Sequence, residues 1–157
     1  RANSDAIQMT QLSDLVGEFP RIDDRVAGLK NRYGFQLVQD MTKPVDLPDR
    51  SATGMLMNTL ARIDLETGEK DTYWIGPVSS LQEPAFIPRP GSTVEGDGYL
   101  IAIENRLAEM ASRLLLFDAM KLAEGPVATI ALPFRIRMGL HGNWVPASEL
   151  PPERRAA

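Results

Sequence analysis

Two successive sets of four short β-type runs restrict what this chain can fold into more than any other feature of its sequence. Such runs, rich in β-branched and aromatic residues and bounded by Gly, Pro and Asp, indicate strands, whereas helical periodicity is scarce. The first set comprises residues 17–22, 33–39, 55–65 and 71–75, and the second comprises residues 83–87, 99–104, 113–118 and 127–132. The sequence therefore predicts an all-β fold with two four-stranded antiparallel units.

The two sets share landmarks at matching places. Each begins with a glutamate that is followed within two residues by a proline, at Glu18 and Glu83, and each third run ends in an aspartate, at Asp64 and Asp118. A four-stranded unit that recurs about every 60 residues is typical of a propeller blade. The repeat lies in the order of the elements, because almost no other residues match between the two sets.

A propeller interpretation divides the chain into two blades, at residues 15–76 and 81–133, and a closing strand with a tail at residues 134–157 that begins a third blade. Since a propeller needs at least about four blades, we expect the 157 residues to be the C-terminal segment of a single propeller domain. The start at Arg1, without a methionine, agrees with a fragment. Blade faces that a complete ring would cover are then exposed, which favours a homo-oligomer or self-association.

Composition narrows the function classes. The net charge is −4 with 24% charged residues, a mildly acidic balance that gives no reason to expect nucleic acid or an anionic membrane surface as a partner. The chain has no cysteine, which excludes disulfides, thiolate metal sites and a cysteine nucleophile and suits a cytoplasmic protein. The apolar runs are far too short for a transmembrane segment. Neither a Gly-rich phosphate loop nor a Gly-x-Ser-x-Gly nucleophile motif is present.

The single histidine, His141, stands where the first strand of a further unit is expected to begin. Glu18, Glu83 and His141 thus occupy comparable positions in three successive units, 65 and 58 residues apart. The first strand of each blade lines the axis of a propeller, so we expect these side chains to converge there. A neutral imidazole is the commonest metal ligand, and a buried glutamate accepts the hydrogen bond of its other ring nitrogen.

The residue types alone leave other interpretations open. A lone histidine beside glycine is more often structural than a ligand, glutamates at strand ends are mostly exposed, and one imidazole cannot hold a catalytic metal by itself. Arg32, Arg135 and Arg137 could bind a carboxylate, although solvated arginines are the simpler interpretation. Three aromatic residues are expected to pack in the core or between blades rather than to bind a substrate: Tyr73, Trp74 and Trp144.

Four segments, taken in order, resemble the carotenoid cleavage oxygenase family and, within it, the bacterial lignostilbene dioxygenases. They read Gly-Glu-Phe-Pro-Arg-Ile-Asp at residues 17–23, Gln-Glu-Pro-Ala-Phe-Ile-Pro-Arg at 82–89, Leu-Phe-Asp-Ala at 116–119 and Gly-Leu-His-Gly-Asn-Trp at 139–144. Each string is weak alone, whereas their order and spacing over nearly the whole chain are specific. The Val-Asp-Leu-Pro loop at residues 45–48 and the His-Gly-Asn-Trp string are closer to the lignostilbene branch.

The resemblance implies a seven-bladed β-propeller with Fe(II) on its axis, bound by four histidines, three of which donate to glutamates. His141 matches the last iron ligand, Glu83 the glutamate that orients it, and Glu18 a glutamate that orients an upstream histidine. Four neutral imidazoles leave two adjacent positions on the iron, where dioxygen has room beside an alkene. The resemblance implies no catalytic residue in this segment beyond the metal ligand, because no general acid or base is needed.

The implied reaction is oxidative cleavage of the central C=C bond of a stilbene such as lignostilbene into two aldehydes, with a small aromatic alkene as substrate and dioxygen as co-substrate. Two alternatives stay open: cleavage of a carotenoid or apocarotenoid, and a non-catalytic propeller segment that serves as a binding or scaffolding module with a structural His141. The other three histidines and the third glutamate are expected upstream of Arg1. The chain alone is therefore expected to be inactive.

Overall fold

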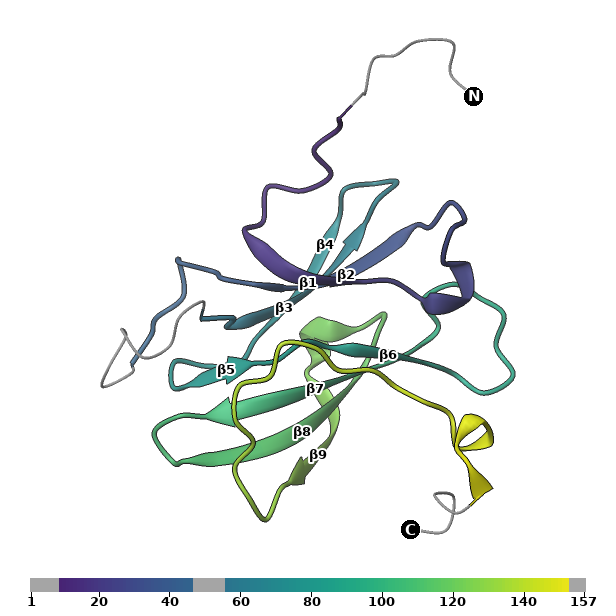
Figure 1. Cartoon of the computed structure of the whole chain (residues 1–157). Coiled ribbons are helices and arrows are strands. Elements are labelled where there is room, and N and C mark those ends of the chain that lie inside the picture. Colours follow the sequence, from purple (N-terminus) through teal and green to yellow (C-terminus); the bar gives the residue numbers. More distant parts are fainter. Residues whose placement is uncertain (1–8, 47–55, 153–157) are drawn as a thin grey trace.

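Two antiparallel sheets lie one above the other in the computed structural model, which describes residues 9–46 and 56–152 (Figure 1). The first sheet contains β1 (Gly17–Arg21), β2 (Tyr33–Val38), β3 (Thr59–Asp64) and β4 (Lys70–Trp74), and each strand pairs with the next one in sequence. This simple up-and-down order is that of a propeller blade. The predicted start of the third run, at Met55, lies outside the described residues.

The second sheet has one more strand than the first. It contains β5 (Ser79–Leu81), β6 (Ala85–Pro88), β7 (Gly98–Arg106), β8 (Ala111–Asp118) and β9 (Pro126–Ala131). Both β5 and β6 pair with β7, followed by β8 and β9 in order. The two short strands therefore act as one edge strand that is interrupted at residues 82–84. We call it the inner strand, because it corresponds to the first strand of the predicted blade.

The predicted all-β fold with two antiparallel units is confirmed. Helical structure within residues 9–46 and 56–152 is limited to three single turns, η1 (Asp24–Val26), η3 (Leu122–Glu124) and η4 (Ala147–Glu149). One strand, β5, was missed because its two serines are not typical of a strand interior. Ser79 is nevertheless buried, since its hydroxyl donates a hydrogen bond of 2.7 Å to Glu104 Oε1.

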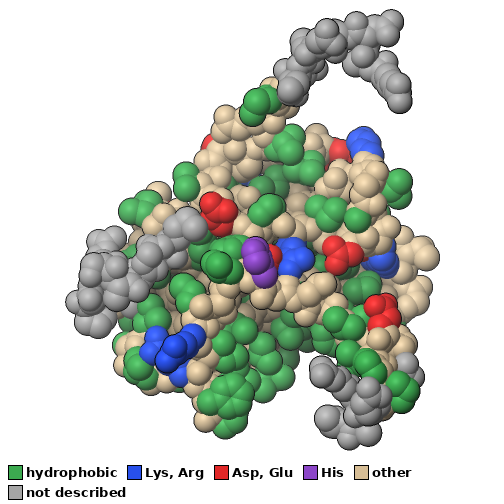
Figure 2. All heavy atoms as spheres, viewed as in Figure 1, with side chains coloured by type: hydrophobic (Ala, Val, Ile, Leu, Met, Phe, Trp, Pro, Cys, Tyr) green, Lys and Arg blue, Asp and Glu red, His purple; other side chains and the backbone are tan. Residues whose placement is uncertain are grey.

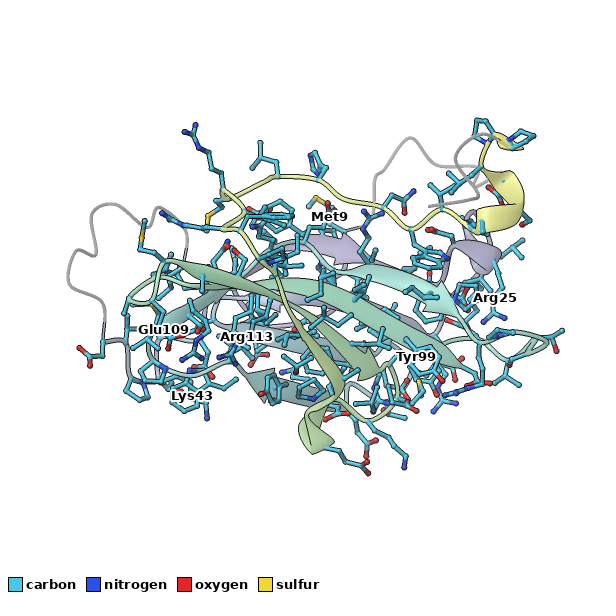
Figure 3. The ribbon with its side chains drawn as sticks, turned by 90° about the horizontal axis from the view of Figure 1, so that it is seen from below. Met9, Arg25, Lys43, Tyr99, Glu109 and Arg113 are labelled. Carbon is cyan, nitrogen blue, oxygen red and sulfur yellow. The ribbon has the colours of Figure 1, made fainter. Side chains whose placement is uncertain are left out.

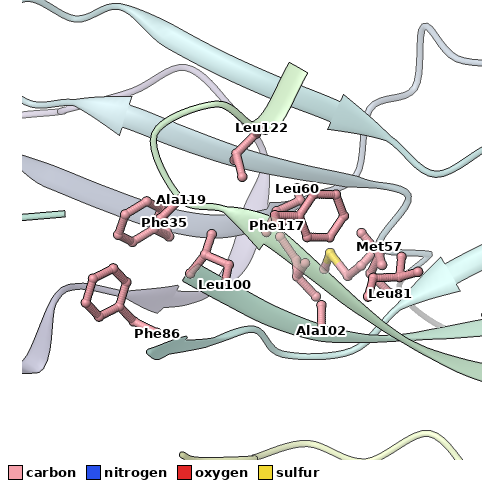
Figure 4. Packing of buried hydrophobic residues seen from close by; sticks show 12 residues of the cluster. Phe35, Met57, Leu60, Leu81, Phe86, Leu100, Ala102, Phe117, Ala119 and Leu122 are labelled. Carbon is pink, nitrogen blue, oxygen red and sulfur yellow. The ribbon is translucent and has the colours of Figure 1, made fainter. Parts of the chain in front are cut away.

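The main hydrophobic core lies between the two sheets (Figure 4). Phe35 stacks on Phe86 with 5.7 Å between ring centroids, and Tyr73 meets Phe117 edge-on at 5.1 Å. The buried members of this cluster are Phe35, Leu37, Met57, Leu60, Leu81, Phe86, Leu100, Ala102, Leu115, Phe117, Ala119 and Leu122. Burying a large apolar side chain contributes about 1.5–3 kcal/mol, so this layer fixes the two sheets against each other.

The opposite face of the second sheet carries another apolar stripe. Ile101 lies opposite Leu116 and Ile103 opposite Leu114 in the β7–β8 ladder, and all four side chains are half-buried. Residues 142–144 lie over this stripe and enclose a pocket of about 190 Å³ with it. Figure 3 shows the chain after β9 running along one side of the stacked sheets. This segment carries the predicted metal ligand.

Polar contacts also join the first sheet to loops of the second, and two of them involve aspartates. Asp71, in β4, accepts a hydrogen bond of 2.8 Å from the backbone N–H of Leu122. Asp23 accepts one of 3.1 Å from the backbone N–H of Gly96 and pairs with Arg25 at 2.6 Å. Apolar packing is not directional, whereas each of these carboxylates binds a specific backbone amide. They therefore fix the position of two loops of the second sheet against the first.

A Tyr–Asp–Arg contact closes one end of the first sheet. Tyr33 lies opposite Asp64 in the β2–β3 ladder, and the Arg32 guanidinium lies 5.1 Å from the Tyr33 ring centroid. Arg32 donates to Asp64 Oδ2 from Nε at 3.0 Å and from its terminal nitrogen at 2.7 Å. The other carboxylate oxygen accepts a hydrogen bond of 3.0 Å from the turn amide of Glu66. Asp64 therefore fixes both the arginine and the turn after β3.

The second sheet repeats this contact with a different arginine. Tyr99 lies opposite Asp118 in the β7–β8 ladder, and the Arg89 guanidinium lies 4.6 Å from the Tyr99 ring centroid. Arg89 donates to Asp118 Oδ2 at 3.1 Å, and Oδ1 accepts a hydrogen bond of 3.0 Å from the Met120 amide. The arginine precedes the second strand in one sheet and follows the inner strand in the other. The two sheets thus share this side-chain contact, although the arginine comes from a different position in the sequence of each sheet.

We predict that the folded chain loses stability in acid as the Asp64 carboxylate becomes protonated. The hydrogen bond from Arg32 holds the pKa of Asp64 well below its usual range, against the burial that raises it, and turn amides lower it further. A carboxyl with a lowered folded-state pKa contributes stability that is fully present above its unfolded pKa of about 3.9 and is lost as the pH falls toward the folded pKa. Thermal midpoints measured from pH 5 to pH 2 are therefore expected to fall.

Asp64→Asn is expected to remove this part of the pH dependence and to lower the midpoint at pH 7. The matched control is Asp24→Asn, because Asp24 is exposed and its carboxylate has no ion pair within the described residues. It should leave the slope with pH unchanged. A slope that Asp64→Asn does not alter would show that other carboxylates control acid unfolding.

Candidate metal centre

The interruption of the inner strand of the second sheet positions the first site residue. The Gln82 amide still donates to the Ile103 carbonyl at 2.9 Å, after which the chain leaves the β7 ladder for two residues. Pro84 has no N–H to donate, so the ladder cannot continue through it. Glu83, between the two, directs its carboxylate toward the chain that follows β9.

Glu83 binds three groups with its two oxygens. Oε2 accepts a hydrogen bond of 2.8 Å from the Gly142 amide and lies 3.2 Å from Nδ1 of His141. Oε1 lies 3.2 Å from Nε of Arg21, which is the last residue of β1. The same arginine donates to the Gly142 carbonyl. The Glu83 side chain is 9% exposed and the His141 side chain is 79% exposed, so a buried carboxylate holds the inner edge of an exposed ring.

The structure thus places Glu83 within hydrogen-bond distance of the His141 ring, where the sequence led us to expect it. An ionised carboxylate only accepts hydrogen bonds, so in this contact the proton is assigned to Nδ1 of His141. This is the tautomer of a histidine that binds a divalent metal through Nε2. Figure 2 shows the histidine side chain at the surface of this face. A pocket of about 60 Å³ lies beside the ring. It is lined by Glu83 and His141 together with Gln82, Ile103, Gly139, Leu140 and Gly142.

A β-bulge in the first sheet brings two further residues to the histidine. The β1–β2 register shifts between Glu18 and Arg21, and Phe19 in the bulge has a φ of 56°. A positive φ is strained for a residue with a bulky side chain and is found where surrounding contacts enforce it. The Phe19 ring meets His141 edge-on, with 6.1 Å between centroids. The bulge thus aims Phe19 at the imidazole and Arg21 at Glu83.

Glu18 does not join this group. Its side chain is exposed and makes no hydrogen bond or ion pair with the part of the chain that the structure describes. Of the three residues expected to converge, only Glu83 and His141 are in contact within the described chain. The role that the family resemblance implies for Glu18, orienting an upstream histidine, stays a prediction.

The predicted strand around His141 is not formed. Residues 132–146 contain no strand in the structure, because a strand requires a neighbouring strand to satisfy its backbone groups. Side chains of the two sheets hold this segment instead. The Ser112 hydroxyl accepts from the Ile136 amide at 2.9 Å, and the Gln82 carboxamide contacts Arg137 and Gly139.

The other sequence candidates have structural explanations. Arg32 is bound to Asp64, whereas Arg135 and Arg137 are exposed on the segment after β9. Tyr73 packs against the core as predicted. Trp144 does not, because it is 42% exposed and lies over the outer face of the second sheet.

Two site residues were missed by sequence reasoning, Arg21 and Gln82. Both lie inside the segments that carry the family resemblance, next to or close to a glutamate that was singled out. That closeness is the signal that could have identified them.

The described residues offer one donor of the kind that a metal site requires. Among residues 9–46 and 56–152, no three His, Cys, Asp or Glu side chains come together to hold a metal. Since the sequence has a single histidine, the chain offers at most one imidazole. The His141 side chain is exposed, and its Nδ1 lies against Glu83. This imidazole can supply one ligand to a metal.

No helix in the described part of the chain is long and apolar enough to span a membrane.

The fold has clear relatives among solved structures. It superposes on the crystal structure of Pseudomonas brassicacearum lignostilbene dioxygenase with a TM-score of 0.82 and 41% sequence identity, over 86% of this chain and 28% of that one. The chain therefore shares the blade architecture of that enzyme.

Sequence comparison leads to the same group of proteins. The chain is 42% identical over 149 residues to lignostilbene-α,β-dioxygenase isozyme III of Sphingomonas paucimobilis, covering 95% of this chain and 30% of the relative. It is 43% identical over 145 residues to isoeugenol monooxygenase of Pseudomonas nitroreducens, covering 92% and 30%. The chain thus spans about 30% of the length of these relatives. The family model for retinal pigment epithelial membrane protein matches residues 1–146, and the chain belongs to this family of carotenoid oxygenases.

Proposed function

We propose that this chain is the C-terminal part of a non-haem Fe(II) dioxygenase with His141 as an iron ligand, and that the intact enzyme splits the C=C bond of a stilbene into two aldehydes. The observation that carries the proposal is the contact of 3.2 Å between Glu83 Oε2 and Nδ1 of His141. It leaves Nε2 as the metal-binding atom. The family and the named relatives support iron and dioxygen as the partners of this histidine.

Each residue of the site has a separate task in this proposal. Glu83 holds the proton on Nδ1 of His141, which raises the basicity of Nε2 and fixes the plane of the ring. Arg21 holds Glu83 from the other side, and Phe19 limits rotation of the imidazole by packing on it. When bound, an iron with an all-imidazole shell would supply open positions where dioxygen meets the alkene. Glu18 is assigned to a histidine outside this chain.

A stilbene is proposed as substrate because the names of two relatives contain lignostilbene and isoeugenol, both of which are alkenes conjugated to an aromatic ring. The proposal also takes the two sheets as successive blades of one propeller domain, with the predicted boundaries at residues 15–76 and 81–133. A cytoplasmic location and self-association of the isolated chain stay predictions.

The isolated chain is expected neither to retain stoichiometric iron nor to cleave a stilbene, because it supplies one imidazole while catalytic metal sites have at least three protein ligands. A chimera that carries it in place of the matching segment of Pseudomonas brassicacearum lignostilbene dioxygenase is expected to do both. Iron analysis and aldehyde formation from a 4-hydroxystilbene with added Fe(II) measure the two results. Light scattering of the isolated chain tests self-association.

A folded chimera without iron would contradict the role of His141 and favour a scaffolding segment. Iron with cleavage of an apocarotenoid in place of the stilbene would correct the substrate class. Stoichiometric iron and turnover by the isolated chain would show that it completes the site without other segments, contrary to the proposal.

A further inference from the structure

Gln82 holds the backbone of the segment that carries His141. Its Nε2 donates to the Arg137 carbonyl at 3.1 Å, and its Oε1 accepts from the Gly139 amide at 2.9 Å. In a parallel ladder, the N–H and the C=O of one residue of a neighbouring strand would bind the same two backbone groups, a carbonyl and the amide two residues later. The carboxamide thus replaces one rung of the missing strand pairing.

The surroundings of Gln82 are built for this contact. The side chain is 7% exposed, and a buried carboxamide requires partners for both its oxygen and its nitrogen. A Cβ atom added to Gly139 would lie 3.1 Å from Gln82 Oε1, so glycine permits the close approach. At the matching place in the first sheet stands Gly17, where a Cβ atom would lie 2.3 Å from the Leu37 carbonyl. The clamp is therefore specific to the sheet that receives His141.

Gln82 and Glu83 act on successive parts of one segment. Gln82 binds residues 137 and 139, and Glu83 binds residues 141 and 142. Since residues 132–146 have no strand neighbour, these side chains determine which residue faces which carboxylate oxygen. A shift of the segment by one residue would break both hydrogen bonds of Gln82 and would move the imidazole away from Glu83.

We propose that Gln82 is a positioning residue: its carboxamide sets the register of residues 137–142 so that Nδ1 of His141 meets Glu83. The inference rests on the proposed function, in which this meeting prepares Nε2 to bind iron. Gln82 itself touches neither the metal ligand nor any reacting atom. A substitution of Gln82 is therefore expected to change the orientation of the His141 ring and the backbone hydrogen bonds of residues 137–142. Gln82 has no direct chemical role.

The experiment uses the chain with ¹⁵N-labelled histidine, which gives one pair of ring signals because the sequence has one histidine. At pH 8 the ¹⁵N shifts of the two ring nitrogens report which one carries the proton. The unmodified chain is expected to show Nδ1–H. Gln82→Leu, which keeps the volume and removes both hydrogen bonds, is expected to shift the ring toward Nε2–H. Amide exchange at Gly142 should become roughly threefold to tenfold faster, as for the loss of a hydrogen bond.

Gln82→Glu is the second variant, for the case in which the leucine variant does not fold. It retains the acceptor for the Gly139 amide and turns the donor for the Arg137 carbonyl into an acceptor, so the same shift toward Nε2–H is expected. Gln36→Leu is the control, because the Gln36 nitrogen is buried without a partner in the described chain. It should leave the ring signals unchanged, whatever its effect on the thermal midpoint.

The outcomes separate the two proposals. If the unmodified chain shows Nε2–H, the contact on which the proposed function rests does not exist in solution. If the unmodified chain shows Nδ1–H and folded Gln82 variants keep it with normal exchange at Gly142, the role of Gln82 is wrong while the proposed function stands. Loss of Nδ1–H in the Gln82 variants and its retention in Gln36→Leu support the inference.

Discussion

His141→Ala is expected to abolish iron retention and aldehyde formation in the chimera with the lignostilbene dioxygenase. The substitution removes a whole ligand, and the neighbouring glutamate would then be a buried carboxylate without its histidine. Glu83→Gln is expected to have the smaller effect that loss of an orienting group has on a metal site, about 10- to 100-fold in metal affinity. Iron per protein after gel filtration and initial rates at saturating Fe(II) measure these changes.

Glu124→Gln is the matched control, because Glu124 is exposed in η3 and pairs with Lys121 at the surface. It should behave like the unmodified chimera. Glu18→Gln gives a separate test of the family assignment: a loss like that of Glu83→Gln would place Glu18 next to another ligand. Full activity of a folded His141→Ala chimera would disprove the assignment of His141.

Phe117→Ala is expected to destabilise the chain by about 3–5 kcal/mol, as do other phenylalanine truncations in well-packed cores. Phe117 is fully buried between the two sheets and meets Tyr73 edge-on at 5.1 Å. Small domains have a total stability of about 5–15 kcal/mol, so the variant is expected to be partly or wholly unfolded at 37 °C. Urea unfolding followed by far-UV circular dichroism measures the free energy of unfolding.

Phe134→Ala is the control for this measurement, since Phe134 is 62% exposed on the segment after β9. Its effect is expected to lie within about 0.5 kcal/mol. A similar midpoint for both variants would mean that the layer between the sheets does not hold the fold together in solution.

The strands were the part of the fold that sequence reasoning predicted best, because alternation of buried and half-buried residues follows from the pleat itself. β7 and β8 show this pattern along almost their whole length. β5 was missed because its buried Ser79 depends on Glu104, a partner 25 residues away in the sequence. The same limit applies to the strand expected at His141, since pairing is a property of the neighbour as well as of the segment.

The candidate site was predicted in part. Spacing and family resemblance placed Glu83 beside His141, and the structure agrees. Arg21 and Gln82 were not predicted, because both act on the backbone of a segment that follows more than 50 residues later, where no periodicity marks the contact. Convergence of Glu18 on the same axis was expected from its matching position, yet position in a repeat does not supply a partner.

The ion pair between Arg21 and Glu83 joins the two sheets at the candidate site. Arg21 ends β1 of the first sheet, and Glu83 lies between β5 and β6 of the second. The orientation of the imidazole therefore depends on the angle between the two sheets. Substitutions deep in the layer between them, far from any ligand, would tilt one blade against the other and turn the ring. Core packing far from His141 would then influence how its imidazole is held.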